Sequence, residues 1–175
     1  MQLKETNKIL NAFGKYVVSQ ARTNLTKSKK NYSKQLYNSI SYSIDEAPAG
    51  SRLYLEMEDY GMFQDKGVRG KNPKLVKNGK QKAPNSPFKF KSKMPPQKPL
   101  MEWAKKKNIR LRDKKGKFQK GSYQTIGFIL QKRIFAQGLK PSLFFTKPFA
   151  KAFKNLPLEI SEGFGLDIEN ILTEL

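Results

Sequence analysis

The chain has 175 residues, of which 37% are apolar, and its formal net charge is +21. It contains no cysteine and no histidine, which excludes a disulfide framework, zinc sites built on those residues and the usual Ser–His or Cys–His catalysis. The length fits one domain. No apolar run is long enough to span a membrane, so we expect a chain made in a cytoplasm and without a membrane partner.

The first predicted elements are a long helix and a β-hairpin. Between residues 3 and 28, apolar side chains recur every three or four positions, which is the spacing of one helix face: Leu10, Phe13, Val17, Ala21 and Leu25. Residues 37–44 then alternate between apolar and serine side chains, and residues 53–57 alternate after a turn at 48–50. Two alternating segments joined by a turn predict an antiparallel hairpin.

The middle of the chain is predicted to be mostly loop. Residues 59–67 indicate a short helix that a glycine stops. From Val68 to Met94 the sequence has no periodicity and several prolines, glycines and lysines, which predicts a long loop. Pro99 lies in the first turn of a helix that carries Trp103, and residues 110–121 form a second basic loop.

Positive charge is concentrated in this middle segment. Residues 66–120 carry twenty basic and two acidic side chains, whereas residues 1–65 carry nine and seven, and residues 121–175 carry six and five. Such a block repels itself, so it is either a solvated insertion or is neutralised by an anionic partner. We expect 1–65 to hold a helix and hairpin, 66–120 to be a basic excursion with one helix, and 121–175 to be the C-terminal helical part of the same core.

Three helices are predicted to complete the chain. Ser122 can cap a helix that ends at Gly138, and Pro148 starts the next. The last helix carries an apolar stripe that needs a partner, either the subunit's own core, which we favour, or the next subunit: Phe164, Ile168, Ile171, Leu172 and Leu175. This order predicts an α+β fold, with a long N-terminal helix and C-terminal helices packed on a small antiparallel sheet, and with long basic loop excursions.

Candidate catalytic groups are few. Glu56 and Glu58 lie two residues apart on the predicted second strand, where a solvated strand face explains them without a metal ion. Gly67–Lys71 contains glycines and a lysine, but it lacks the spacing of a phosphate-binding loop. We therefore expect no enzyme activity, no cofactor, no metal and no small-molecule substrate.

Four sets of short segments follow one another along the chain. They are Ala21-Arg22-x-Asn24-Leu25 with Leu36-x-Asn38-Ser39-Ile40; Tyr60 through Val68; Met94-Pro95-Pro96 with Leu100-x-x-Trp103 and Lys107-Asn108-Ile109; and Ile126 through Gly138-Leu139-Lys140-Pro141-Ser142-Leu143-Phe144-Phe145. In this order they resemble segments of tailed-phage neck and tail-completion (head–tail connector) proteins. The family has glycine where this chain has Asn108, and asparagine also tolerates a left-handed backbone.

The resemblance implies a structural subunit without catalytic residues. It implies a homo-oligomeric ring of roughly six or twelve copies in the virion neck or tail, between portal or adaptor and tail proteins, with loops toward DNA in the lumen. The candidate assembly or core anchors are Tyr60, Phe63, Trp103, Phe144 and Phe145. Candidate contacts to nucleic acid or an acidic protein surface are Lys66, Arg69, Lys71, Lys74, Lys105, Lys106, Lys107, Arg110, Arg112, Lys114, Lys115 and Lys117. A sequence-independent nucleic-acid-binding or DNA-packaging protein is the alternative.

Overall fold

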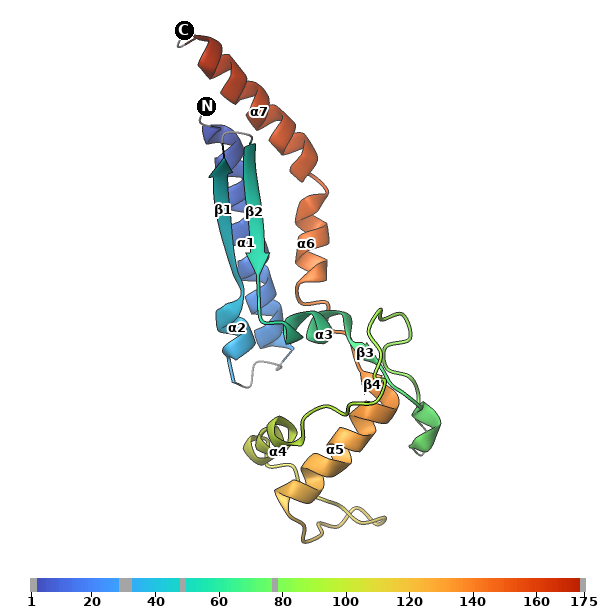
Figure 1. The fold of residues 1–175 in the computed structure, drawn as a ribbon. Helices are drawn as coiled ribbons and strands as arrows, with labels where there is room; N and C mark the ends of the chain where they lie inside the picture. The colour runs from blue at the N-terminus through green and yellow to red at the C-terminus, as the bar shows by residue number, and fades with distance from the viewer. Residues whose placement is uncertain (1–2, 29–32, 48–49, 77–78, 174–175) are drawn as a thin grey trace. The chain divides into compact units, whose positions relative to one another are not determined.

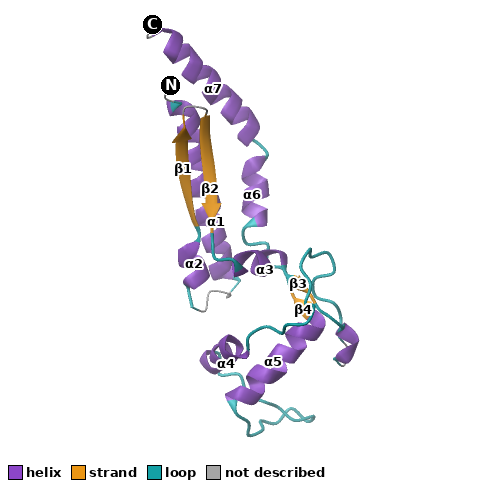
Figure 2. Cartoon of the chain, in the orientation of Figure 1, coloured by secondary structure: helices purple, strands orange, loops and turns teal. Residues whose placement is uncertain are grey.

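The computed structural model describes residues 3–28, 33–47, 50–76 and 79–173. It confirms the expected α+β fold, with a long first helix, C-terminal helices and a small antiparallel sheet (Figure 1, Figure 2). The chain forms two compact units, which we call unit 1 (residues 1–61 and 143–175) and unit 2 (residues 62–142).

These units differ from the segments drawn from charge alone. Helix α5 (Tyr123–Gln137) packs against helix α4 (Gln97–Lys106), so it belongs to unit 2 rather than to the core of unit 1. Gly127 allows this packing, because a Cβ there would lie 3.1 Å from the Cβ of Met101. Because α5 packs on α4, unit 2 ends at residue 142, whereas the basic segment was expected to end at residue 120.

Helix α1 (Lys4–Lys27) is the predicted long helix, and its apolar stripe is the centre of unit 1. Val17, Ala21 and Leu25 are at most 1% exposed. The stripe packs against the hairpin of β1 (Ser41–Ala47) and β2 (Gly50–Glu56), whose antiparallel register runs from Ser41–Glu56 to Ala47–Gly50. The predicted hairpin is therefore confirmed, although Pro48 and Ala49 of its turn lie outside the described residues.

The first strand begins later than the alternation predicts. Residues Gln35–Ser39 form helix α2 instead, and β1 begins at Ser41. Leu36 and Ile40, four residues apart, are both buried. Asn38, midway between them, is exposed, whereas in a strand all three side chains would share one face. This burial pattern is that of a helix turn, and it outweighs the local alternation of serine with apolar residues.

Helices α6 (Thr146–Phe153) and α7 (Leu156–Thr173) pack on α1 and complete unit 1. The buried face of α7 is not the predicted stripe: it consists of Leu156, Gly163 and Asp167. A Cβ on Gly163 would lie 2.5 Å from the Cδ1 of Ile9, so this glycine lets α7 approach α1 closely.

Placing the whole C-terminal stripe in the core of its own unit was wrong. Phe164 is 45% exposed and Leu172 is 67% exposed, while Leu175 lies outside the described residues. The physical reason is the face that packs on α1: Gly163 leaves room for Ile9, and the Asp167 carboxylate accepts hydrogen bonds from the Glu5 and Thr6 N–H groups.

Local stop and start signals in unit 2 are confirmed. Helix α3 (Tyr60–Lys66) ends before Gly67, whose φ of +72° favours glycine. The Ser122 hydroxyl accepts a hydrogen bond from the Thr125 N–H at 3.1 Å and caps α5. Strand β3 (Val68–Arg69) then pairs antiparallel with β4 (Gly138–Leu139), which joins two segments distant in sequence.

The segment 68–94 is mostly loop, as its composition predicts, but specific hydrogen bonds order parts of it. Besides β3 it contains a 3₁₀ turn, η1 (Pro73–Leu75), and Arg69 exchanges backbone hydrogen bonds of 2.8 and 3.0 Å with Phe88 and Phe90. The Gln81 amide pairs with both backbone groups of Gly70, at 2.7 and 3.1 Å. Irregular backbone pairing and single polar side chains make these bonds, and neither leaves a periodic pattern in a sequence.

Candidate functional site

Almost all of the net charge lies in unit 2. This unit has 23 Lys and Arg side chains against three Asp and Glu, a net of +20, whereas unit 1 has a net of +1. One of the three acids, Asp65, is fully buried, and Asp113 is partly buried. The exposed charge of unit 2 is thus almost entirely positive, which attracts anions from solution.

The candidate basic residues do not share one environment. Lys66 and Arg69 are half-buried, and the Nε of Arg69 is buried without a hydrogen-bond partner. Lys71 and Lys74 are exposed after β3, with the Lys71 ammonium 5.7 Å from the centre of the Phe135 ring. The others are exposed in the last turn of α4 and the segment after it: Lys105, Lys106, Lys107, Arg110, Arg112, Lys114, Lys115 and Lys117.

Asn108 determines how the chain leaves α4. Its φ is +49°, and its N–H donates to the Lys105 carbonyl at 3.0 Å, while the Ile109 N–H donates to the Ala104 carbonyl at 2.9 Å. These two bonds are those of a Schellman motif, which normally has glycine at the left-handed position. Asparagine fills that position here, as expected from the sequence, and directs residues 110–120 away from the helix.

Residues 110–120 form a tight hairpin, which we call the basic hairpin. Arg112 and Phe118 pair across it, and the Gln119 N–H donates to the Leu111 carbonyl at 3.0 Å. The Asp113 carboxylate accepts hydrogen bonds of 2.8 Å from the backbone N–H groups of both Lys115 and Lys117. Asp113 therefore organises the turn, and its charge offsets only one of the six cations in the hairpin.

Phe118 is a candidate that the sequence analysis did not select. Its side chain is 61% exposed, and two guanidinium carbons lie over its ring, Arg112 at 4.3 Å and Arg110 at 5.7 Å from the centre. The sequence does show an aromatic residue among cations, which is a signal of a binding site. The position of both arginines over its ring, however, follows only from the pairing across the hairpin. The loop that carries it extends beyond the N-terminal end of α5 (Figure 1).

The five anchor candidates separate into core and surface residues. Phe144 is 1% exposed in the core of unit 1, and Phe145 is half-buried, stacked on Phe149 at 5.8 Å. Trp103 is half-buried in unit 2. Tyr60 and Phe63 are 41% and 44% exposed on α3. Partial burial, and next the Glu58 carboxylate, raise the pKa of Tyr60 above its ordinary value.

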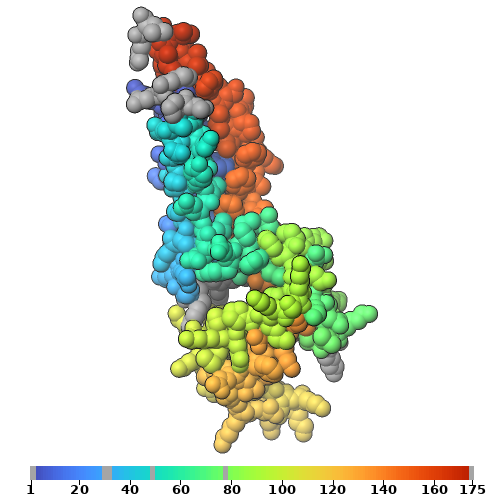
Figure 3. All heavy atoms as spheres, viewed as in Figure 1, coloured from blue at the N-terminus to red at the C-terminus, as the bar shows by residue number. Residues whose placement is uncertain are grey.

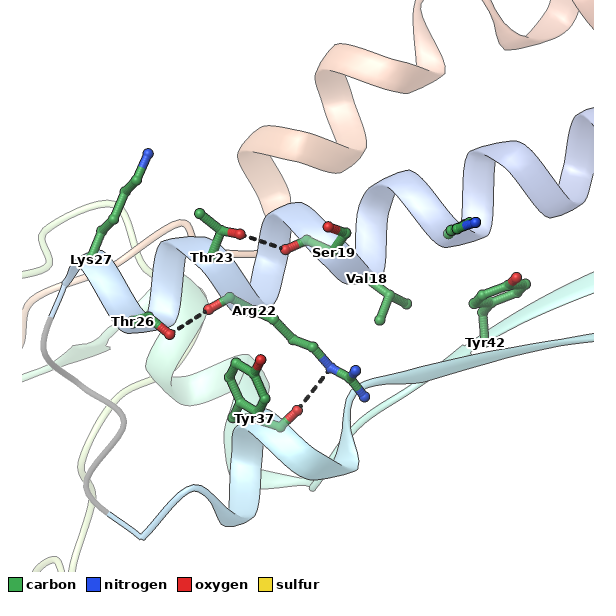
Figure 4. A pocket seen from close by; sticks show the side chains of 9 residues that line it. Val18, Ser19, Arg22, Thr23, Thr26, Lys27, Tyr37 and Tyr42 are labelled. Atoms are coloured by element: carbon green, nitrogen blue, oxygen red, sulfur yellow. Dashed lines mark hydrogen bonds between the residues drawn. The ribbon is translucent and has the colours of Figure 1, made fainter.

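A groove of about 590 Å³ lies in unit 1 between α1 and the segment α2–β1 (Figure 4). Its Arg22 donates to the carbonyls of Tyr37 and Ile40 at 3.1 and 2.9 Å. Arg22 therefore satisfies carbonyls at the end of α2 and is committed to the fold. Asn24 plays a similar part, since its amide donates to the Phe144 carbonyl at 3.1 Å.

No known family model, curated protein or solved structure matches this chain. Among the described residues, no helix is both long and apolar enough to cross a membrane. Over the same residues, no three acidic side chains come together to hold a metal ion, Glu56 and Glu58 included. The charge and geometry of the two units are thus the basis on which a function is proposed.

Proposed function

We propose that this chain is a non-catalytic structural virion protein that forms part of a ring at the neck, or head–tail connection, or in the tail of a phage. Unit 1 makes the contacts to further copies and to portal, adaptor or tail proteins, and unit 2 meets an anionic partner. The observation that carries the proposal is the separation of charge, +1 in unit 1 against +20 in unit 2. A ring around DNA needs both properties in one subunit.

An uncovered apolar surface in unit 1 supports self-association. Five large apolar side chains of α6 and α7 are at least 45% exposed: Phe153, Leu158, Phe164, Leu166 and Leu172. Helix α7 lies along the surface in the space-filling view (Figure 3). These exposed side chains favour contact with another protein, and copies of a nearly neutral unit do not repel one another there.

The mass of the full-length chain in solution tests the ring. We expect one defined multimer in light scattering, and we expect Leu172→Asp to reduce it to monomers, because a carboxylate is costly to bury in an apolar contact. Ser161→Asp is the matched control, since Ser161 is exposed on the same helix but adds no apolar surface. A chain that is monomeric at all concentrations would contradict the proposal.

The location in the particle is a separate test. A label on the chain should appear at the junction of head and tail, or along the tail, when purified virions are imaged. Absence of the chain from purified virions would exclude a structural virion role, whatever its mass in solution.

The alternative function is sequence-independent binding of nucleic acid, as in a DNA-packaging protein. The basic hairpin favours it, because exposed lysines and arginines around an exposed aromatic ring suit contact with phosphates and bases. The two functions predict different oligomeric states and different locations for the chain. The alternative predicts salt-sensitive binding by a monomer or dimer, without a defined multimer and without incorporation into virions.

A further inference from the structure

The basic hairpin holds its two arginines in fixed positions. The Arg112 Nη1 donates to the Gly116 carbonyl at 3.0 Å, and the Arg110 Nε donates to the Asn108 side-chain oxygen at 3.3 Å. Both guanidinium groups also lie over the ring of Phe118. Each arginine thus has two restraints, and little side-chain freedom is lost when either binds an anion.

The ring itself is available to a ligand. Phe118 is 61% exposed even though two guanidinium groups lie over it. Most of the ring surface is therefore left open to a partner. Flat aromatic ligands stack on such a ring, and adjacent arginines add a cation–π contribution.

We propose that the basic hairpin binds an unpaired base of a single-stranded nucleic acid, with the base stacked on Phe118 and the flanking phosphates bound by Arg110 and Arg112. This inference rests on the proposed contact of unit 2 with nucleic acid and specifies its chemistry. Stacking on an aromatic ring is indifferent to base identity, because every base has a π face. The site therefore favours single-stranded over double-stranded nucleic acid without favouring any base sequence.

The geometry disfavours insertion of Phe118 between the base pairs of a duplex. A wedge that unstacks two base pairs presents both faces of its ring to them. The Arg112 guanidinium carbon lies over the ring only 4.3 Å from its centre, so one face is already occupied. A single exposed base needs only one face of the ring, so a single strand fits this arrangement better than a duplex does.

Binding of three labelled probes by the full-length chain tests the proposal. The probes are an oligothymidylate of about 20 nucleotides, an abasic strand of the same length and a closed circular duplex, measured by fluorescence anisotropy. We expect Phe118→Leu to lower affinity for the oligothymidylate about tenfold and to leave the abasic strand and the duplex unchanged, since only the first offers bases to the ring. Phe118→Trp should retain the affinity.

Phe128→Leu is the matched control. Phe128 is also a half-exposed phenylalanine of unit 2 with a cation over its ring, Lys132 at 4.5 Å, but it lies on α5 outside the basic hairpin. This variant should bind all three probes as the parent does. Circular dichroism of each variant verifies that the helices are retained.

Four results would overturn the inference. Equal loss on the thymidylate and abasic strands would mean that the ring only positions the arginines. No loss on any probe, or an equal loss with Phe128→Leu, would mean that Phe118 contacts no base. Failure of the parent chain to bind any probe would also overturn it, while the multimer mass and the virion imaging would still decide the ring independently.

Discussion

Unit 1 and unit 2 are each stabilised by a different kind of internal interaction. In unit 1, the stripe of α1 is buried between a hairpin and two helices, and both apolar clusters found among the described residues belong to it. In the described part of unit 2, three of the six buried apolar side chains are alanines, Ala83, Ala104 and Ala136. Hydrogen bonds such as those of Gln81 and Ser86 hold its loops.

This difference shows how one chain can carry a polycation and still fold. Twenty net charges on a unit with a small core oppose compaction by self-repulsion. Hydrogen bonds at fixed backbone positions are short-ranged and directional, so they specify the loops while the lysine side chains remain in solvent. Unit 1, which is nearly neutral, relies on apolar burial instead.

The largest expected effect concerns the charge of unit 2. If it binds DNA, six lysine contacts cost about a thousandfold in affinity between about 50 and 200 mM salt. Replacing six exposed lysines of unit 2 by glutamine should flatten this dependence, measured as affinity against salt: Lys105, Lys106, Lys107, Lys114, Lys115 and Lys117.

The matched control makes the same change of charge in unit 1. It replaces six exposed lysines there by glutamine: Lys4, Lys8, Lys15, Lys147, Lys151 and Lys154. An unchanged salt slope is expected for this control. Equal flattening by both sets would show that total charge matters rather than its location. A six-lysine variant of unit 2 that binds DNA normally but fails to join particles would instead identify an acidic protein surface as the partner.

Mutation of two phenylalanines compares the core of unit 1 with the surface of unit 2. Phe144→Ala should lower the free energy of unfolding by about 3–5 kcal/mol, because it empties a site that is 1% exposed. Phe118→Ala should change it by less than about 0.5 kcal/mol, because that ring is 61% exposed. Urea unfolding monitored by circular dichroism measures both. Comparable losses would mean that the basic hairpin is part of a core.

Asp167 joins the ends of unit 1, and this contact should depend on pH. Its carboxylate accepts hydrogen bonds from the backbone N–H groups of Glu5 and Thr6 at 2.8 and 2.9 Å, at the start of α1. Burial alone would raise the pKa of Asp167, but these backbone bonds lower it below its ordinary value of 3.8. The charged form is thus favoured by folding, as expected for an anion at a helix N-terminus.

The sign of the pH effect follows from that lowered pKa. The contribution of Asp167 should be complete above its ordinary pKa of 3.8 and be lost as pH falls through the lower folded value. Asp167→Asn should cost about 1–3 kcal/mol at pH 7, and the difference from the parent should shrink at acid pH. Urea unfolding at pH 7 and at about pH 3 tests this. A difference that does not change with pH would contradict a role for the charge.

The smallest expected effect concerns Asn108 in unit 2. Asn108→Gly should be neutral or slightly stabilising, because glycine adopts its φ of +49° without strain. Asn108→Ala should cost about 1 kcal/mol, the penalty of a side chain in the left-handed region. Thermal unfolding of the two variants, which differ by one methyl group, gives the comparison. Equal midpoints would mean that this turn does not depend on its backbone angle.

The local signals of the sequence predicted the elements well. The stripe of α1, the hairpin, the Ser122 cap and the stops at Gly67 and Gly138 all follow from spacing or from one residue's backbone preference. Each depends on interactions within a few residues, which a sequence displays directly. The net charge of the middle segment was equally plain, since it needs only counting.

Tertiary structure alone decided which surfaces met. Helix α7 turned Gly163 and Asp167 inward and left Phe164 and Leu172 exposed, because a close helix crossing and two capped N–H groups outweighed the burial of larger apolar side chains. The placement of α5 in unit 2 and of two arginines over Phe118 likewise depends on pairings between distant or folded-back segments. Composition and periodicity do not predict such pairings, because the free energy of a pairing depends on the two surfaces that meet in the folded chain.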